Sequence, residues 1–347
     1  MSFRLLPEWA PQDAIMLTWP HKNTDWVNIL SDVEPVYVTL CQQISQVQKM
    51  LIVAHTPVLK QHITTLLNNA SIDLGNIVFV IAPCNDTWAR DHGPITVANK
   101  QGKLKVKDFT FNGWGNKYEA QLDNKLNTAI ATQAMSEHIQ FDSINFVLEG
   151  GGIEINEHGT LLTTSACLLN PNRNPEFSKE QVEYILSQEL GAEAFLWVEH
   201  GYLAGDDTDS HIDTLVRFAP NNTIVYVTCD DINDEHYVEL ANMQRQLASF
   251  TTPSGSKYNI VPLPWPKAIY NDEKERLPAT YANYLILNNT VLVPIYGDDN
   301  DSLAISQIQS AYPQHTVIGI DCLPIIHQFG SLHCITMQLP RGFLQQE

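Results

Sequence analysis

The chain has 347 residues, of which 44% are hydrophobic and 17% charged, a composition typical of a folded globular protein and not of a disordered one. Its formal net charge of −19 disfavours nucleic-acid binding and favours a cationic ligand, although an acidic surface also serves solubility. No basic region precedes an apolar one at the amino terminus, and no apolar run reaches the roughly 18 residues of a membrane span, so we expect a cytoplasmic protein without a membrane partner.

Taken in chain order, the hydrophobic periodicity predicts short strands that alternate with amphipathic helices. The first segment is predicted to contain strands at 14–19, 50–54 and 77–81 and helices at 33–47 and 57–67. Four units with the order strand, strand, helix, strand then follow. The first has the boundaries 95–98, 104–109, 122–137 and 143–147, and the second 152–155, 160–164, 178–190 and 195–198. The third has 212–218, 223–228, 234–248 and 259–263, and the fourth 284–287, 291–295, 301–311 and 316–320. Ser178 is the predicted N-cap of its helix.

A last predicted strand, at 335–339, has no partners left near it in the sequence. It completes a fifth unit only if it pairs with the amino-terminal segment, which closes the repeats into a ring without an open sheet edge between the first and last units. The mean period is then about 70 residues, as expected for a large repeat. The sequence therefore predicts one α/β domain, residues 1–347, folded as a five-bladed α/β propeller of pseudo-fivefold ββαβ repeats.

The same repeat predicts where chemistry is concentrated. A polar residue stands at the entrance to the first strand of each unit: Asp91, Glu149, His211, Asn283 and Cys334. Pseudo-fivefold symmetry brings these five towards one axis. If 212–218 is a strand, the side chains of His211 and Asp213 project on the same side, because strand side chains alternate.

The six cysteines lie far apart, which favours reduced thiols over a disulfide framework or a zinc site. Cys334 follows the small-residue turn Gly330-Ser331 and opens an apolar run, so it is the candidate nucleophile. Since a free cysteine is usually a small buried hydrophobe, that interpretation is given to the others, Cys41, Cys84, Cys167, Cys229 and Cys322. Histidines such as His158, His200, His236 and His327 are scattered, so we expect no metal.

Several motifs keep two interpretations. The glycines after Glu149 indicate either a turn into a strand or a close approach of a ligand or neighbouring blade. Trp88 and Trp114 suit the core as well as a binding surface. Asp207 belongs to an acidic loop that is either solvated or in contact with substrate, and 170–175 reads as a turn-rich connection without assigned chemistry.

Six segments together resemble the agmatine deiminase family, which is related to the bacterial-type peptidylarginine deiminases and belongs to the guanidine-modifying (pentein) superfamily of five-bladed α/β propellers. They are Trp-Ala-Arg-Asp-His-Gly-Pro (88–94), Phe-Asn-Gly-Trp-Gly (111–115), Leu-Glu-Gly-Gly-Gly (148–152), Leu-Leu-Asn-Pro-Asn-Arg-Asn-Pro (168–175), Asp-Thr-Asp-Ser-His-Ile-Asp (207–213) and Gly-Ser-Leu-His-Cys-Ile-Thr (330–336). The chain departs from the family at three positions, where His92, Gly113 and Ser210 replace the more usual threonine, alanine and glycine.

The resemblance implies a role for each matching residue. It implies Cys334 as nucleophile, His211 as general acid and base, Asp91 and Asp213 as guanidinium-binding carboxylates, and Glu149 as a support for His211 and the substrate. It further implies that Trp88, Trp114, Asp207 and Asn283 bind the remainder of the substrate.

The implied reaction is hydrolysis of agmatine to N-carbamoylputrescine and ammonia, a step of polyamine (putrescine) biosynthesis. It proceeds through a cysteine thiouronium intermediate and needs no cofactor, because a thiolate both attacks and leaves. The expected partner is a small cationic guanidine, and a homo-oligomer is expected. Three alternatives stay open: deimination of free or peptidyl arginine, an amidinotransferase, and a guanidine-binding protein without catalysis.

Overall fold

Each β-sheet of this computed structural model contains one strand that is paired antiparallel on one side and parallel on the other. The structure describes residues 2–345, so Met1 and residues 346–347 of the predicted 1–347 domain lie outside the described residues. The strands are β1 (Phe3–Leu5), β2 (Gln12–Thr18), β3 (Lys49–Ala54), β4 (Ile77–Ile81), β5 (Ile95–Asn99), β6 (Leu104–Thr110), β7 (Gln140–Val147), β8 (Ile153–Ile155), β9 (Thr160–Thr164), β10 (Ala194–Val198), β11 (Val216–Ala219), β12 (Thr223–Val227), β13 (Asn259–Leu263), β14 (Leu285–Ile286), β15 (Thr290–Ile295), β16 (Thr316–Asp321) and β17 (Thr336–Pro340). They form five sheets, with the orders β1-β5-β6-β7, β10-β9-β8, β11-β12-β13, β14-β15-β16 and β17-β2-β3-β4.

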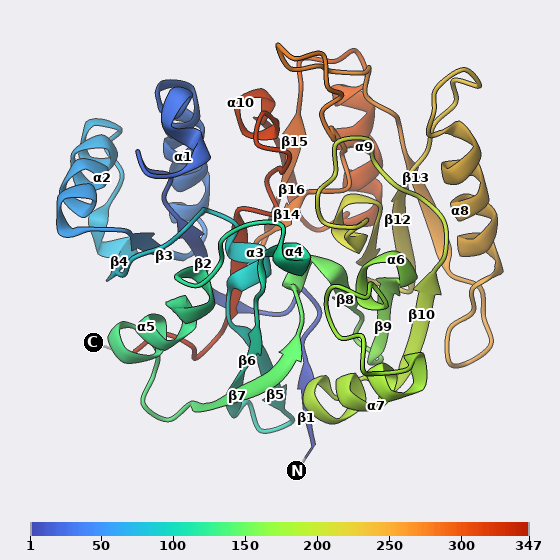
Figure 1. The fold of residues 1–347 in the computed structure, drawn as a ribbon, viewed down its shortest axis with the longest axis horizontal. Coiled ribbons are helices and arrows are strands. Elements are labelled where there is room, and N and C mark those ends of the chain that lie inside the picture. Colours follow the sequence, from blue (N-terminus) through green and yellow to red (C-terminus); the bar gives the residue numbers. More distant parts are fainter. Residues whose placement is uncertain (1, 346–347) are drawn as a thin grey trace.

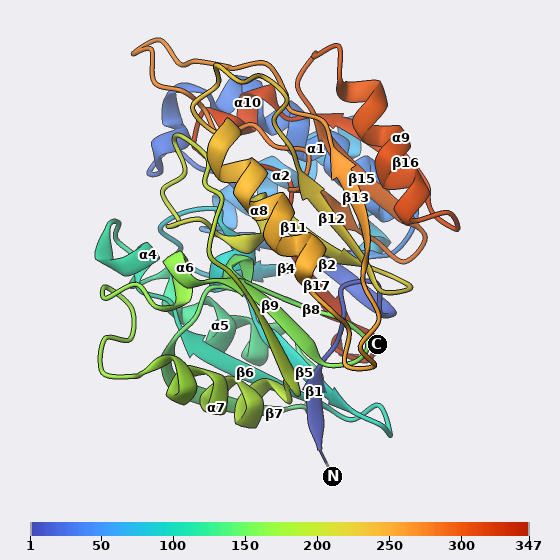
Figure 2. The same ribbon diagram turned by 90° about the vertical axis from the view of Figure 1, so that its right-hand side faces the viewer.

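The longer helices lie around the periphery of the molecule, outside the sheets (Figures 1 and 2), whereas the short α3 and α4 lie near the middle of the view in Figure 1. The α-helices are α1 (Leu30–Ser45), α2 (Pro57–Asn69), α3 (Ala89–His92), α4 (Gly113–Asn116), α5 (Leu126–Gln133), α6 (Ser165–Leu168), α7 (Lys179–Leu190), α8 (Tyr237–Ser249), α9 (Asp301–Ala311) and α10 (Leu323–Ile326). The 3-10 turns are η1 (Asp25–Asn28), η2 (Leu74–Asn76), η3 (Asp123–Lys125), η4 (Gly150–Gly152) and η5 (Ile212–Thr214). None of the described helices is both long enough and apolar enough to cross a bilayer.

The two ends of the chain share a sheet. Strand β17 pairs antiparallel with β2, with Thr336 opposite Leu17 and Gln338 opposite Ile15. This confirms the predicted pairing of the last strand with the amino-terminal segment. The same segment also contributes β1, which pairs antiparallel with β5 and was not predicted from the sequence.

Most predicted elements are present, and the mixed α/β class is confirmed. Ser178 caps α7 through a capping box in which its hydroxyl and the side chain of Gln181 exchange hydrogen bonds with each other's backbone. The helix predicted at 122–137 is shorter, because η3 precedes α5 and α5 ends at Gln133.

One correction affects the argument about the site. The segment predicted as a strand at 212–218 begins with the 3-10 turn η5, and β11 starts only at Val216. The turn is held by hydrogen bonds from Thr214 N to His211 O (3.3 Å) and from Leu215 N to Ile212 O (3.1 Å). The expectation that His211 and Asp213 share one face of a strand is therefore wrong, although both side chains are fully buried.

Candidate active site

Loops and short helical turns carry four of the polar residues that the repeat predicted to meet, together with Asp213. Asp91 lies in α3, Glu149 precedes η4, His211 precedes η5, Asp213 lies within η5, and Cys334 lies just before β17. All five side chains are buried, none with more than 6% of its surface exposed. Water therefore screens these ionisable groups only weakly, and the charge of each group strongly shifts the pKa of the others.

Asp91 is oriented by two donors. Trp114 Nε1 donates to Oδ2 at 3.0 Å, and the backbone N–H of Gly151 donates to Oδ1 at 3.1 Å. His211 Nδ1 lies 3.5 Å from the same Oδ1. Burial raises the pKa of Asp91 to about 6, although the positive charge of His211 opposes the shift. The carboxylate is thus fixed in orientation, with one edge directed towards the imidazole.

A tight left-handed turn presents Trp114 to this site. The φ angles are +67° at Gly113, +54° at Trp114 and +86° at Gly115, a region that favours glycine. A Cβ at Gly113 would also overlap the carbonyl of Tyr118. Glycine at 113, where the family more often has alanine, therefore fits the backbone that this chain adopts.

The surroundings of His211 raise its pKa above that of a free imidazole. Burial alone would lower its pKa, but the negative charge of Asp91, with contributions from Cys167 and Glu149, raises it to about 10. The ring lies beside Glu149 and Cys167. One imidazole nitrogen, a carboxylate oxygen of Glu149 and Cys167 Sγ all lie within 4.8 Å of one another. The raised pKa favours the proton-donating form of the histidine before a substrate arrives.

An arginine that the sequence analysis left without a role fixes Glu149. Arg173 Nε lies 2.9 Å and 3.0 Å from the two carboxylate oxygens of Glu149. The same guanidinium donates to Asp209 Oδ2 at 2.7 Å and to the carbonyl of Thr208 at 2.9 Å. Arg173 thus ties Glu149 to the acidic loop before His211. The sequence signals for it were a single cation within an otherwise uncharged turn segment and the place of that segment among the six family motifs.

Asp213 is supported from behind by a second buried charge cluster. His333 Nδ1 lies 2.6 Å from Asp213 Oδ2, and His333 Nε2 lies 2.8 Å from Glu8 Oε1. Arg217 donates to Glu8 Oε2 at 2.5 Å and also pairs with Glu154. Burial acts to raise the pKa of Asp213, but the hydrogen bond from His333 and the nearby positive charges hold it below its ordinary range. Asp213 therefore stays ionised.

Asn283 positions the candidate nucleophile. Its Oδ1 accepts the backbone N–H groups of His333 (2.9 Å) and Cys334 (3.3 Å) and lies 3.4 Å from Cys334 Sγ. Asp213 Oδ2 is 3.9 Å from the same sulfur. Burial, together with the charges of Asp213 and Asp91, raises the pKa of the thiol well above its ordinary value. The structure places Asn283 behind the thiol, where it shapes the loop and does not line the cavity below.

The thiol opens into a cavity of about 160 Å³. The cavity is lined by Asp25, Asp86, Trp88, Asp91, Trp114, Tyr118, Asp206, Asp207, Thr208, Thr214, Gln328, Phe329, Gly330 and Cys334. Aromatic rings and carboxylates dominate this lining, and no lysine or arginine among the described residues contributes to it. Such a lining suits a ligand that combines positive charge with an aliphatic chain.

The substrate-binding candidates Trp88, Trp114 and Asp207 all line this cavity. The ring of Trp88 packs against Gly330 so closely that a Cβ there would overlap it. Asp207 Oδ2 accepts a hydrogen bond from the hydroxyl of Tyr118 at 2.7 Å. Asp86, which the sequence analysis did not select, also faces the cavity and accepts from Trp26 Nε1 at 2.7 Å.

Comparisons with known proteins agree with this geometry. The model of the Porphyromonas-type peptidyl-arginine deiminase family matches residues 4–340. A Vibrio parahaemolyticus protein named "Putative agmatine deiminase" is 31% identical, over 98% of this chain and 97% of its own. A Porphyromonas gingivalis structure described as "Putative Arginine Deiminase" is 44% identical with a TM-score of 0.93, covering 99% and 100% of the two chains. A substrate-bound variant of C. jejuni agmatine deiminase is 38% identical with a TM-score of 0.89, covering 98% and 97%.

Proposed function

The chain belongs to the Porphyromonas-type peptidyl-arginine deiminase family, and from that premise we propose that it hydrolyses agmatine to N-carbamoylputrescine and ammonia. One observation carries the proposal: a thiol, an imidazolium and two buried carboxylates meet at the end of a cavity lined by further carboxylates. A relative at 38% identity is named an agmatine deiminase, which supports the same substrate.

Binding of the guanidinium is the first step of the proposed mechanism. A guanidinium is planar and offers pairs of parallel N–H donors, which carboxylates accept in a bidentate manner. Asp213 Oδ2 lies 3.9 Å from the thiol and Asp91 Oδ1 lies 3.5 Å from His211 Nδ1, so we propose that the two carboxylates hold the cation between them. Their charges orient the cation and hold its central carbon in place for attack, which speeds the reaction through proximity and orientation.

Covalent chemistry follows in two stages. Cys334 loses its thiol proton to solvent as the cation binds, and the thiolate Sγ attacks the guanidinium carbon. The carbon–nitrogen bond to one terminal nitrogen then breaks as His211 gives that nitrogen a proton, so that ammonia leaves. The thiouronium that remains is attacked by water, which loses a proton to His211 and forms the carbon–oxygen bond of a second intermediate. The hydroxyl of this second intermediate loses its proton as the carbon–sulfur bond breaks and the thiolate leaves, so that the neutral ureido product is released and the thiol is regenerated by uptake of a proton at Sγ.

The fold supports the finer interpretation as a five-bladed propeller. Each of the five sheets combines an antiparallel and a parallel pair, and the β17–β2 pairing joins the two chain ends in one of them. We propose that these sheets are the five blades and that the residues at their strand entrances surround one axis. Such a ring explains how residues far apart in sequence reach one cavity.

We expect the thiol of the free enzyme to be protonated and a bound cation to promote its ionisation. The raised pKa of Cys334 comes from burial and from the charges of Asp213 and Asp91, which a cation between them would offset. Inactivation by neutral 2-chloroacetamide should therefore rise about tenfold per pH unit up to pH 9, following the thiolate fraction. The cationic isostere 2-chloroacetamidine should react much faster at pH 7.

Glutathione provides the reference for the intrinsic reactivity of the two reagents. Rate constants for inactivation are measured from pH 6 to pH 9 and divided by those for glutathione. A plateau of the chloroacetamide rate below pH 8 would show that the thiolate exists before any cation binds, and would contradict substrate-assisted ionisation.

Recognition of the far end of agmatine is the basis of a further prediction. Asp207 lines the cavity, and we expect Asp207→Asn to weaken binding of the terminal ammonium. The loss of a hydrogen bond between charged groups, about 1.5–3 kcal/mol, should raise KM for agmatine about tenfold or more. Butylguanidine, which has the same guanidinium without the ammonium, should show little change in KM or kcat. Equal losses on both substrates would show that Asp207 serves the reacting centre or the loop.

An ammonia-release assay over agmatine, free arginine and an arginyl peptide tests the proposed function. We expect a clear preference for agmatine, because no lysine or arginine among residues 2–345 lines the cavity to receive the carboxylate of arginine. The name of the P. gingivalis relative favours arginine as the second candidate. Ammonia released without an added amine acceptor excludes the amidinotransferase, and no ammonia from any of the three guanidines would reject the proposal.

A further inference from the structure

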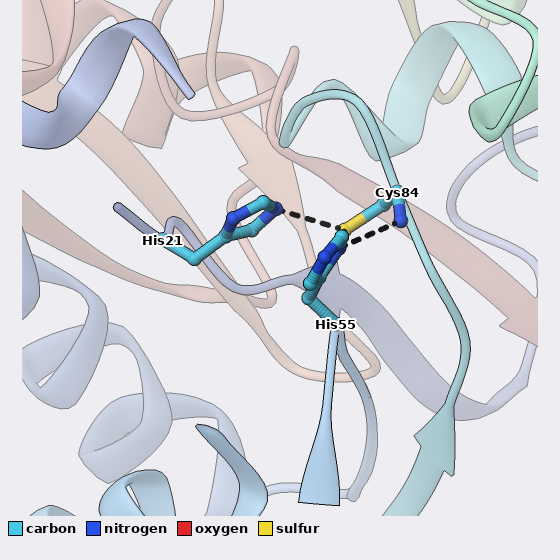
Figure 3. A group of neighbouring side chains, drawn as sticks. All are labelled: His21, His55 and Cys84. Atoms are coloured by element: carbon cyan, nitrogen blue, oxygen red, sulfur yellow. Dashed lines mark hydrogen bonds between the residues drawn. The ribbon is translucent and has the colours of Figure 1, made fainter. Parts of the chain in front are cut away.

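A second group of reactive side chains lies beside the loop that carries Trp88. His21 follows β2, His55 follows β3 and Cys84 follows β4, and these three strands are parallel neighbours in one sheet. Because the carboxyl ends of parallel strands meet at the same sheet edge, residues widely separated in sequence come together there. Figure 3 shows the two imidazoles directed towards the sulfur of Cys84.

The distances suit coordination of one metal ion. Cys84 Sγ lies 3.4 Å from His21 Nε2 and 3.8 Å from His55 Nδ1. These two atoms and the sulfur are all within 4.8 Å of one another. With metal–sulfur and metal–nitrogen bonds of about 2.3 and 2.0–2.1 Å, a tetrahedral ion separates sulfur from nitrogen by about 3.6 Å. The three side chains therefore need only small rotations to share an ion.

The donor set fits a particular class of metal. Thiolate and imidazole ligands favour Zn²⁺ over the harder Mg²⁺ and Ca²⁺. His55 Nδ1 accepts the backbone N–H of Cys84 at 3.1 Å, so this nitrogen is unprotonated, and a metal bound to it would replace that hydrogen bond. His21 Nδ1 accepts only a long hydrogen bond from Asn23 N, at 3.3 Å, and can take up the proton that Nε2 gives up on ligation.

We propose that His21, His55 and Cys84 form a binding site for Zn²⁺, separate from the catalytic cavity. The Cys84 thiol loses its proton to solvent as the sulfur–metal bond forms. His21 and Cys84 are buried and His55 is half-buried, so the ion would be reached from the side of His55 and would keep a fourth position for water.

The position of the site gives it a consequence for the catalytic cavity. Cys84 opens the segment that continues to Asp86 and Trp88, both of which line that cavity. Asp123 already holds this segment by accepting the backbone N–H of Asn85 at 2.7 Å. A metal on Cys84 would fix the beginning of the same segment, so the site would stiffen one wall of the cavity without contacting substrate.

Titration with Co²⁺ and Zn²⁺ tests the proposal. Co²⁺ takes the same ligands as Zn²⁺ and reports a thiolate ligand by charge-transfer absorption in the near ultraviolet. The full-length Cys334→Ser protein is used throughout, so that the catalytic thiol cannot contribute. We expect this absorption to appear with one equivalent of Co²⁺, to be displaced by Zn²⁺, and to disappear when Cys84→Ser is added. Zn²⁺ should also raise Tm, because it binds only the folded chain.

Two further variants separate the site from its alternatives. His55→Gln removes a half-buried ligand, which the fold tolerates more readily, and should weaken Co²⁺ binding about tenfold or more. Cys167→Ser removes the other thiol that lies beside a histidine and a carboxylate, and should leave the absorption unchanged. The proposal would be overturned if the parent protein showed no thiolate absorption, or if the absorption survived Cys84→Ser. The three side chains would then be interpreted as a sulfur–imidazole hydrogen-bond cluster.

Discussion

Replacement of Cys334 by serine is expected to lower kcat at least about 10⁴-fold on agmatine, the scale of losing a catalytic nucleophile. Serine preserves the shape of the side chain and can still donate to Asn283 Oδ1, which lies 3.4 Å from the sulfur, so the fold should remain intact. A hydroxyl, however, ionises far less readily than a thiol and is a poorer leaving group from the covalent intermediate. Ammonia release under saturating agmatine measures the loss, with circular dichroism and Tm as checks on folding.

Matched variants make this result specific. Cys41→Ser and Cys322→Ser change equally buried thiols in α1 and before α10, and should keep most of the activity. In a His211→Gln protein followed by mass spectrometry, we expect agmatine-derived mass on Cys334 to form slowly, because ammonia leaves without its acid, and then to persist, because the water that removes it lacks its base. Turnover at the wild-type rate by Cys334→Ser would reject the proposed mechanism.

Substitution of Gly151 by alanine should lower kcat/KM about 100-fold or more without unfolding the protein. A Cβ at this position would lie 2.6 Å from His211 Nδ1, 2.8 Å from Asp91 Oδ1 and 3.2 Å from Asp213 Oδ2. The methyl group would therefore separate three groups of the proposed mechanism, and displacements near 1 Å cost on this scale. The φ angle of Gly151 does not lie in the left-handed region, so alanine introduces no backbone strain there.

Gly152→Ala is the matched control within the same turn. Its Cβ would meet Cys167 Sγ at 3.1 Å and only the far side of the His211 ring at 3.8 Å. We expect a smaller loss of kcat/KM than for Gly151→Ala, with a similar Tm. If the two alanine variants lost activity equally, or if Gly152→Ala lost more, close packing at Gly151 would not be what holds the site together.

The local pattern of the sequence was sufficient for most elements and for the ring closure. Helix α9 was predicted with its observed bounds, Asp301–Ala311, because helix periodicity depends on neighbouring residues. The pairing of β17 with β2 followed from a general cost, that of leaving a sheet edge unpaired. The convergence of Asp91, His211 and Cys334 followed from repeat register together with family motifs.

The sequence pattern did not predict where the backbone changes from a helical turn to a strand within one motif. The residues 212–218 were predicted as one strand, yet η5 replaces its beginning. The side chains of His211 and Asp213 are fully buried and approach polar groups from other segments, Asp91 and His333. Tertiary contacts at the site therefore override the local strand preference.

Only the tertiary structure shows which charged residues lie behind the site residues and how burial and charge shift the pKa values there. Arg173 reaches Glu149, and Glu8 reaches His333 across 325 residues of sequence. His21, His55 and Cys84 meet in the same way at the edge of one sheet. Ion pairs and ligand clusters depend on where side chains lie in space, and they leave no periodic signal along the chain. The sequence by itself determined which groups are available for chemistry, whereas burial and neighbouring charge, which depend on the tertiary structure, raise the pKa of both His211 and the Cys334 thiol.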